Sequence, residues 1–178
     1  METFITAKSR LEQTDVPGYW RTIDNELYYD KDCNLILVPR YFWTDGYTFP
    51  KIVMAILGDK NRYDVRPAHA HDLFCRFHEE IVVKCSLTIL KSEGYLKEHK
   101  GKIVCEDLPE KYLEIRKISK WDADCTFKRM MKACGIDKCI ANIIRFGVFF
   151  NLRWLQTGKK SLKTYNIFNE DIGLVNGL

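Results

Sequence analysis

The sequence lacks the short motifs that identify several common enzyme classes. It contains no GxSxG, no Walker A P-loop, no GxGxxG and no HExxH. Nucleophile-elbow hydrolases, P-loop NTPases, dinucleotide-binding enzymes and zincin proteases therefore have no support. Internal repeats and low-complexity tracts are absent as well. The reaction, if there is one, has to be inferred from scattered residues.

Paired cysteines and an export signal are also missing. The seven cysteines are an odd number, no CxxC occurs, and the first residues, METFITAKSRLEQ, contain no apolar core of a signal peptide. This pattern predicts reduced thiols in a cytoplasmic protein and disfavours a zinc knuckle. Most of the cysteines are expected to behave as small buried hydrophobic residues.

No hydrophobic run is long enough to cross a membrane. The most apolar stretch, residues 139–156, is interrupted by Asn142, Arg145, Asn151 and Arg153. These polar side chains make it a poor membrane span. A helix packed on the core is favoured over one that docks a membrane surface or a partner.

Charge is present in moderation. The chain has 178 residues and a net charge of +4, and its basic residues occur in ones and twos. The length predicts a single domain over residues 1–178. The weak positive bias favours an anionic small molecule as partner, while the lack of a basic cluster gives no clear nucleic-acid patch.

Short extended segments dominate the first third of the chain. Residues 19–23 and 26–30 are rich in β-formers and flank an Asp-Asn turn, which predicts a hairpin. Residues 34–43 form a third extended run, and Pro39 within it indicates an edge position or a bulge. A short helix is expected over residues 50–58.

Helices are expected to dominate the second half. One begins near Pro67 and runs to residue 80; another is capped by Ser119 and ends at Gly135. A long helix follows over residues 136–158. Residues 80–90, 102–108 and 111–118 fit either helix or strand, and residues 159–178 read as an irregular tail. The predicted fold is α+β, with N-terminal short antiparallel strands followed by a mainly helical half.

The segment AHAHDLFCRFHEE, residues 68–80, holds three of the four histidines. On a helix His71, Cys75 and His78 share one face, and Asp72 lies beside His71. An imidazole next to a carboxylate suits a divalent transition metal. Further ligands would come from Asp45 in the turn TDGYTFP and from Asp124 in the first turn of its helix.

Each of these residues also has an ordinary structural explanation. Asp45 fits a turn that ties its own loop, and Asp124 fits a first helical turn, where the dipole favours acids. Cys75 and His78 are interpreted as packing residues. A Cys75 nucleophile activated by His71 or His78 is conceivable on that face, but it ranks below the metal site.

Three motifs resemble a small family of tailed-phage and prophage proteins of unknown function. VPRYFWTDGYTFP, AHAHDLF and ADCTFKRMMKACGI are similar to the family patterns VPxGFxTDxxSxP, HDxLY and ADxxF, and together they span about residues 36–150. Tyr41 stands where the family pattern has glycine. The matched positions are Thr44, Asp45, Pro50, His71, Asp72, Asp124 and Phe127. The resemblance implies a phage context, and hence the host cytoplasm, and a shared site.

These observations lead to two functional hypotheses. The first is a phage-encoded, metal-dependent hydrolase acting on a phosphoester or nucleotide-type anion, with zinc, manganese or magnesium as the metal. The second is a non-catalytic phage protein that binds a host or virion protein or sequesters a small ligand, in which the same residues form a buried hydrogen-bond network.

The first hypothesis assigns a role to each candidate residue. The predicted metal ligands are Asp45, His71, Asp72 and Asp124; the catalytic residues are Asp72 and His71; the substrate-binding residues are Thr44, Thr48, Arg62, Arg66 and Arg76. The doublet with a later Asp is also similar to metal phosphohydrolases of the H…HD…D type. Those enzymes need an earlier histidine, and none precedes His69 here.

Overall fold

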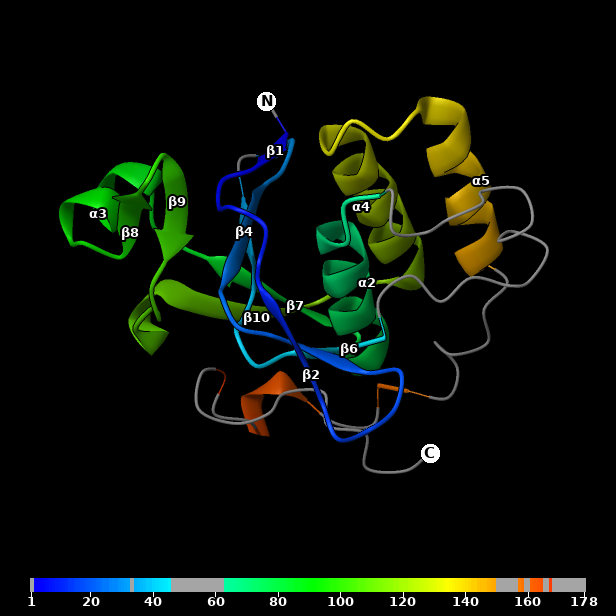
Figure 1. Ribbon diagram of the computed structural model, residues 1–178, viewed down its shortest axis with the longest axis horizontal. Coiled ribbons are helices and arrows are strands. Elements are labelled where there is room, and N and C mark those ends of the chain that lie inside the picture. Colours follow the sequence, from blue (N-terminus) through cyan, green and yellow to red (C-terminus); the bar gives the residue numbers. More distant parts are fainter. Residues whose placement is uncertain are drawn as a thin grey trace.

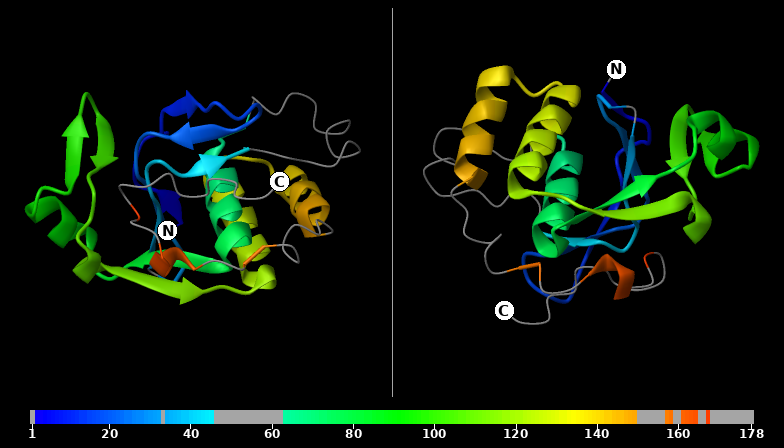
Figure 2. Two further views of the ribbon diagram at one scale, coloured as in Figure 1. Left: turned by 90° about the horizontal axis from the view of Figure 1, so that it is seen from below. Right: turned by 180° about the vertical axis from the view of Figure 1, so that it is seen from behind.

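The computed structural model describes residues 2–32, 34–45, 63–149, 157–158, 161–164 and 167. A central sheet runs through the molecule, helices pack on one side of it, and a small helix-and-hairpin unit projects from the opposite edge (Figure 1; Figure 2).

The central sheet has five antiparallel strands in the order β1-β4-β5-β7-β10. Their bounds are β1 Thr3–Phe4, β4 Glu26–Tyr29, β5 Leu35–Val38, β7 Glu79–Val83 and β10 Leu113–Lys117. All four residues of β5 are buried. The run of Leu, Ile and Val in β5 and the Ile-Val-Val of β7 are what a strand covered on both faces requires.

Two smaller sheets flank the central one. A three-stranded sheet has the order β2-β3-β6, and a two-stranded hairpin pairs β8 with β9. The strands are β2 Leu11–Gln13, β3 Trp20–Thr22, β6 Trp43–Thr44, β8 Leu96–His99 and β9 Lys102–Cys105.

The described helices are α2 Arg66–Phe77, α3 Leu87–Ser92, α4 Lys120–Ala133 and α5 Lys138–Phe149, with 3-10 turns at Glu110–Tyr112 and Leu162–Thr164. Three of these α-helices form layers on the central sheet, and α3 belongs to the projecting unit with β8 and β9. Helix α2 contacts β5, β6 and β7; α4 packs on α2, and α5 packs on α4 (Figure 1). One core forms where Leu73 and Phe74 meet the sheet, and a second forms around Phe127 and Ile144.

The predicted α+β class is confirmed, with N-terminal strands preceding the helices. The segments left open between helix and strand contain both: residues 80–90 divide between β7 and α3, while residues 102–108 and 111–118 supply β9 and β10. Within the described part of the chain, no helix is long and apolar enough to cross a membrane.

The predicted hairpin is wrong. Strand β3 pairs with β2 and β6, whereas β4 pairs with β1 and β5, so the two segments belong to different sheets. The Asp24-Asn25 pair does not close a turn between them. Instead Asp24 accepts hydrogen bonds from Arg10, and the Asn25 amide donates to the carbonyl of Cys105 at 3.2 Å. Long-range partners outcompeted the local turn propensity.

The third extended run is split at Pro39. Strand β5 ends at Val38, and the chain re-enters extended structure at Trp43 in another sheet. Because β5 lies in the middle of the central sheet, the predicted edge position is also wrong. Pro39 comes directly after the strand, where its missing N–H breaks no ladder hydrogen bond.

Tyr41 makes the turn between these strands possible. Its φ is +64°, in the left-handed region that favours glycine. The Tyr41 N–H donates to the carbonyl of Thr22 at 2.7 Å, and Phe42 N donates to the Thr22 hydroxyl at 3.0 Å. Glycine is the residue that such a turn prefers.

The helix predicted over residues 67–80 has a different C-terminal end in the structure. Helix α2 ends at Phe77, His78 has a φ of +55°, and Glu79 and Glu80 belong to β7. The helix predicted to run to residue 80 therefore ends three residues earlier. Helix α5 is described as far as Phe149. The expected helix at residues 50–58 and most of the expected tail at 159–178 lie outside the described residues.

Candidate functional site

Helix α2 carries the His-Asp doublet into the interior. Pro67 lies in the first turn, where its missing N–H costs nothing, and the helix is buried along most of its length. His71 is 8% exposed and Asp72 is 7% exposed. A buried imidazole and a buried carboxylate need partners, since each loses its hydration on folding. The structure supplies those partners from two other elements.

The first partner of the doublet comes from α4. His71 Nε2 lies 2.9 Å from Oδ1 of Asp124, which is fully buried. Lys120, one turn earlier on α4, donates to the other oxygen of Asp124 at 2.9 Å. The Lys120 ammonium also donates to the carbonyl of Val148 on α5 at 3.3 Å. The Phe127 ring stacks on His71 at a centroid distance of 4.5 Å and fixes the plane of the imidazole.

The second partner comes from β6. The Thr44 hydroxyl donates to Oδ2 of Asp72 at 2.6 Å, and Thr44 is fully buried. Arg76, one turn further along α2, has a guanidinium nitrogen 3.9 Å from the same carboxylate oxygen. The guanidinium lies over the rings of Phe42 and Tyr19, at 5.2 and 5.8 Å from their centroids.

The electrostatic balance of this cluster stabilises the charged forms. Burial alone lowers the pKa of His71, but the neighbouring Cys75 and the hydrogen bond to Asp124 raise it to about 10. Burial alone raises the pKa of Asp124, but hydrogen bonds from His71 and Lys120 bring it below its ordinary value. An imidazolium held between aromatic and carboxylate groups is the expected state near neutral pH.

The structure brings together four of the predicted site residues as two contacting pairs. His71 meets Asp124, and Asp72 meets Thr44, with Arg76 close to Asp72. Asp45 follows Thr44 directly and is half-buried. The three distant segments of the chain therefore do converge around α2.

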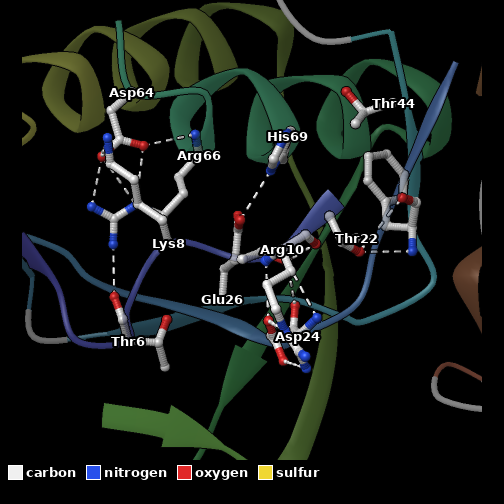
Figure 3. A network of polar contacts seen from close by, with 12 residues as sticks. Thr6, Lys8, Arg10, Thr22, Asp24, Glu26, Thr44, Asp64, Arg66 and His69 are labelled. Carbon is white, nitrogen blue, oxygen red and sulfur yellow. Dashed lines mark hydrogen bonds and ion pairs between the residues drawn. The ribbon is translucent and has the colours of Figure 1, made fainter. Parts of the chain in front are cut away.

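Other predicted residues lie elsewhere. Arg66 is engaged at the N-terminal end of α2, where it binds Asp64 at 2.7 Å and donates to the Thr6 carbonyl at 2.7 Å (Figure 3). That position gives it a structural role between α2 and the N-terminal segment. Thr48 and Arg62 lie outside the described residues.

The described part of the chain does not provide a complete set of ligands for a metal ion. No group of three or more His, Cys, Asp or Glu side chains there could hold a metal ion. Both oxygens of Asp124 already have partners, and one partner is the ammonium of Lys120. A cation bound by Asp124 would have to displace Lys120 or His71.

Sequence reasoning missed two polar contacts of this region. Lys120 gave a signal, because Lys and Asp four residues apart on a helix face each other. The buried pair of His69 and Glu26, whose Nδ1 and Oε1 atoms are 3.0 Å apart, gave none, because Glu26 lies 43 positions away on β4 (Figure 3). His69 Nε2 and Glu26 Oε2 have no hydrogen-bond partner among the described residues.

Comparison with known protein families shows the family of this chain. A family model described as "Protein of unknown function (DUF1353)" matches residues 20–148. The chain belongs to the DUF1353 family. The match covers every predicted site residue, and it also covers Lys120 and the His69–Glu26 pair. Comparisons with curated proteins and with solved structures give no match. Family membership leaves both functional hypotheses open, and the phage origin stays a prediction.

Proposed function

We propose that this DUF1353 protein is a phage-encoded hydrolase of the host cytoplasm that acts on a phosphoester or nucleotide-type anion. Its centre is the His71-Asp72 doublet together with Asp124. The observation that supports this proposal is the meeting of acid, imidazole and cationic groups from β6, α2 and α4 around one helix. Such convergence of distant segments is typical of a reactive centre, where perturbed titratable groups gather.

The charges around the doublet suit an anionic substrate. With His71 protonated, the cations His71, Arg76 and Lys120 lie beside the carboxylates of Asp72 and Asp124. A phosphoryl group develops negative charge on its oxygens during transfer, and such cations stabilise it. His71, oriented by Asp124, would donate a proton to the leaving oxygen.

A divalent metal remains part of the hydrolase hypothesis only through a restricted set of residues. Asp45 and Asp72 have carboxylate oxygens suited to magnesium or manganese, and His71 has an imidazole nitrogen suited to zinc, but the three do not form a metal-binding group in the described part of the chain. A bound cation would supply a polarised water at the doublet.

The main experiment is a hydrolysis assay on the purified full chain. The substrates are p-nitrophenyl phosphate, its bis-ester and nucleoside triphosphates, each with a chelator or with added zinc, manganese or magnesium. We expect turnover of at least one substrate, reduced about 10²–10⁴-fold in His71→Gln and Asp124→Asn. His99→Gln, in the exposed hairpin, is the matched control and keeps full activity.

Elemental analysis tests the metal separately. Stoichiometric metal that is lost in both His71→Ala and Asp45→Asn supports metal-assisted hydrolysis. Turnover that persists in the chelator removes the metal from the proposal and leaves the hydrolase. Absence of turnover with every substrate, from folded protein, contradicts the hydrolase.

A second candidate function is favoured by one specific observation. The groups of the doublet have partners within the protein: the two Asp124 oxygens, His71 Nε2 and Asp72 Oδ2 all make contacts. A closed, buried network of this kind also fits a non-catalytic protein that binds a host or virion partner or sequesters a small ligand. In that case the protein hydrolyses none of the substrates, and His71→Gln only lowers its melting temperature.

A further inference from the structure

Trp20, the first residue of β3, holds a large aromatic side chain partly in solvent. Its exposed fraction is 42%. The other exposed large apolar side chains among the described residues are Ile89 on α3, Trp121 on α4 and Phe146 on α5. An indole offers a broad apolar face for stacking together with a polar N–H, so an exposed tryptophan beside a polar site suits contact with a planar ligand. The surroundings of Trp20 therefore decide its use.

The register of the three-stranded sheet places Trp20 beside the candidate site. Trp20 lies directly opposite Thr44 in the antiparallel ladder of β3 and β6. Opposed residues of such a ladder project from the same face of the sheet, with Cβ atoms about 4.5–5.5 Å apart. That face is turned toward α2, because the Thr44 hydroxyl donates to Oδ2 of Asp72 at 2.6 Å. A single side chain, Thr44, thus links the indole to the His71-Asp72 doublet.

This face of the sheet changes from buried to open along β3. Thr22, two residues after Trp20, shares the face and is fully buried. Beside Thr44, the carboxylate of Asp72 and the guanidinium of Arg76 are 3.9 Å apart, and both side chains are largely buried. Trp20 stands at the open end of the same face. A ligand whose anionic group lies at the doublet would therefore extend outward past the indole.

We propose that Trp20 stacks on the nucleobase of a nucleotide whose phosphate lies at the His71-Asp72 doublet. This inference rests on the proposed function and narrows its substrate class from phosphoesters in general to nucleotides. The ribose, which separates base from phosphate, spans the position of Thr44. Every base has a π-face, so one indole recognises nucleotides as a class and does not select a particular base. A phosphoester without a planar group gains nothing from Trp20.

Binding of paired ligands tests the stacking without any reaction. The full chain is titrated by calorimetry with the four nucleoside 5′-monophosphates and with ribose 5-phosphate, which has the same sugar and phosphate but no base. We expect at least one nucleotide to bind at least about fivefold more tightly than ribose 5-phosphate. Trp20→Ala and Trp20→Leu should remove this preference, while Trp20→Phe, which keeps a ring, should retain part of it. Trp121→Ala, which removes an exposed tryptophan from α4, is the matched control and keeps the preference.

Two results of these titrations overturn the inference. One is a wild type that shows no base-dependent preference, and the other is a preference that survives in both Trp20→Ala and Trp20→Leu. The leucine variant keeps an apolar side chain at this position, so a loss of folding in the alanine variant alone does not prevent the comparison. Melting temperatures of all variants identify any that are unfolded.

Turnover separates failure of this inference from failure of the proposed function. Trp20→Ala should raise the KM for the nucleotide with little change in kcat, because stacking on a base remote from the phosphorus stabilises bound substrate and transition state alike. Equal kcat/KM values of the wild type for a nucleotide and for ribose 5-phosphate reject the role of Trp20 and leave the hydrolase. Nucleotide binding that requires Trp20, in a protein that hydrolyses no phosphoester, rejects the hydrolase and retains the nucleotide site.

Discussion

At the scale of single residues, Tyr41 shows how a residue other than glycine can adopt a left-handed backbone conformation. Its φ of +64° places Cβ close to the neighbouring carbonyl oxygen, which costs roughly 1–2 kcal/mol for a residue other than glycine. The ring offsets part of this cost, because the guanidinium groups of Arg40 and Arg21 lie 4.9 and 5.5 Å from its centroid.

A pair of substitutions isolates the backbone strain at this position. Tyr41→Gly and Tyr41→Ala both remove the ring, so they differ mainly in their tolerance of a positive φ. We expect Tyr41→Gly to be the more stable of the two by about 1 kcal/mol in urea unfolding. At the neighbouring Arg40, whose φ is not positive, the order should reverse. An alanine variant at position 41 that matches the glycine variant would show that the turn is not strained.

At the scale of secondary-structure elements, local signals predicted the helices well and the sheet partners poorly. Ser119 accepts a hydrogen bond from the N–H of Asp122, as a capping serine does, and Gly135 follows the helix with a φ of +80°. Both signals lie within a few residues of the helix end. Strands β3 and β4 each pair with one strand near in the chain, β2 and β5, and with one distant strand, β6 and β1. No local pattern encodes the distant partners.

The same distinction applies to the candidate site. Position on α2 alone places His71 beside Cys75, and the spacing on α4 places Lys120 beside Asp124. The contact between His71 and Asp124 depends on how α2 packs on α4. Residue spacing along the chain does not determine this packing, so the sequence could only suggest the contact. The sequence does not predict the partner of His69, because no residue near Glu26 indicates that Glu26 is buried.

The His69–Glu26 pair joins α2 to β4 and carries a testable energetic consequence. Both side chains are fully buried. Burial lowers the pKa of His69, but the charge of Glu26 and its hydrogen bond produce a net increase. Removing one partner leaves the other buried and uncompensated, so His69→Leu and Glu26→Met should each cost about 3–5 kcal/mol.

The double variant distinguishes a buried pair from two independent packing residues. We expect Glu26→Met with His69→Leu to recover most of the stability lost in either single variant, because two apolar side chains of similar volume replace the pair. Urea unfolding of the four proteins gives the coupling energy. Losses that simply add in the double variant would mean that the pair contributes only through packing.

At the scale of the whole molecule, Arg66 ties the N-terminal segment to the helical layer. Arg66 at the start of α2 binds Asp64 and donates to the carbonyl of Thr6, and its guanidinium lies 4.3 Å from the centroid of the Phe4 ring (Figure 3). Burial alone would raise the pKa of Asp64, but the hydrogen bonds and charge of Arg66 bring it below its ordinary value of 3.8.

Acid unfolding should therefore depend on Asp64. Since the pKa of Asp64 is lower in the folded protein than in the unfolded chain, its contribution to stability is fully present above pH 4 or so and is lost as the pH falls through the folded-state value. We expect Asp64→Asn to be less stable than the wild type at pH 7 and to lose less stability between pH 5 and pH 2, by at most about 1.4 kcal/mol per pH unit. Urea unfolding across this range measures the slope. Asp32→Asn, which removes an exposed carboxylate of equal charge, is the control for net charge and should keep the wild-type slope. An Asp64→Asn slope identical to that of the wild type would mean that the ion pair at the start of α2 does not link the fold to pH.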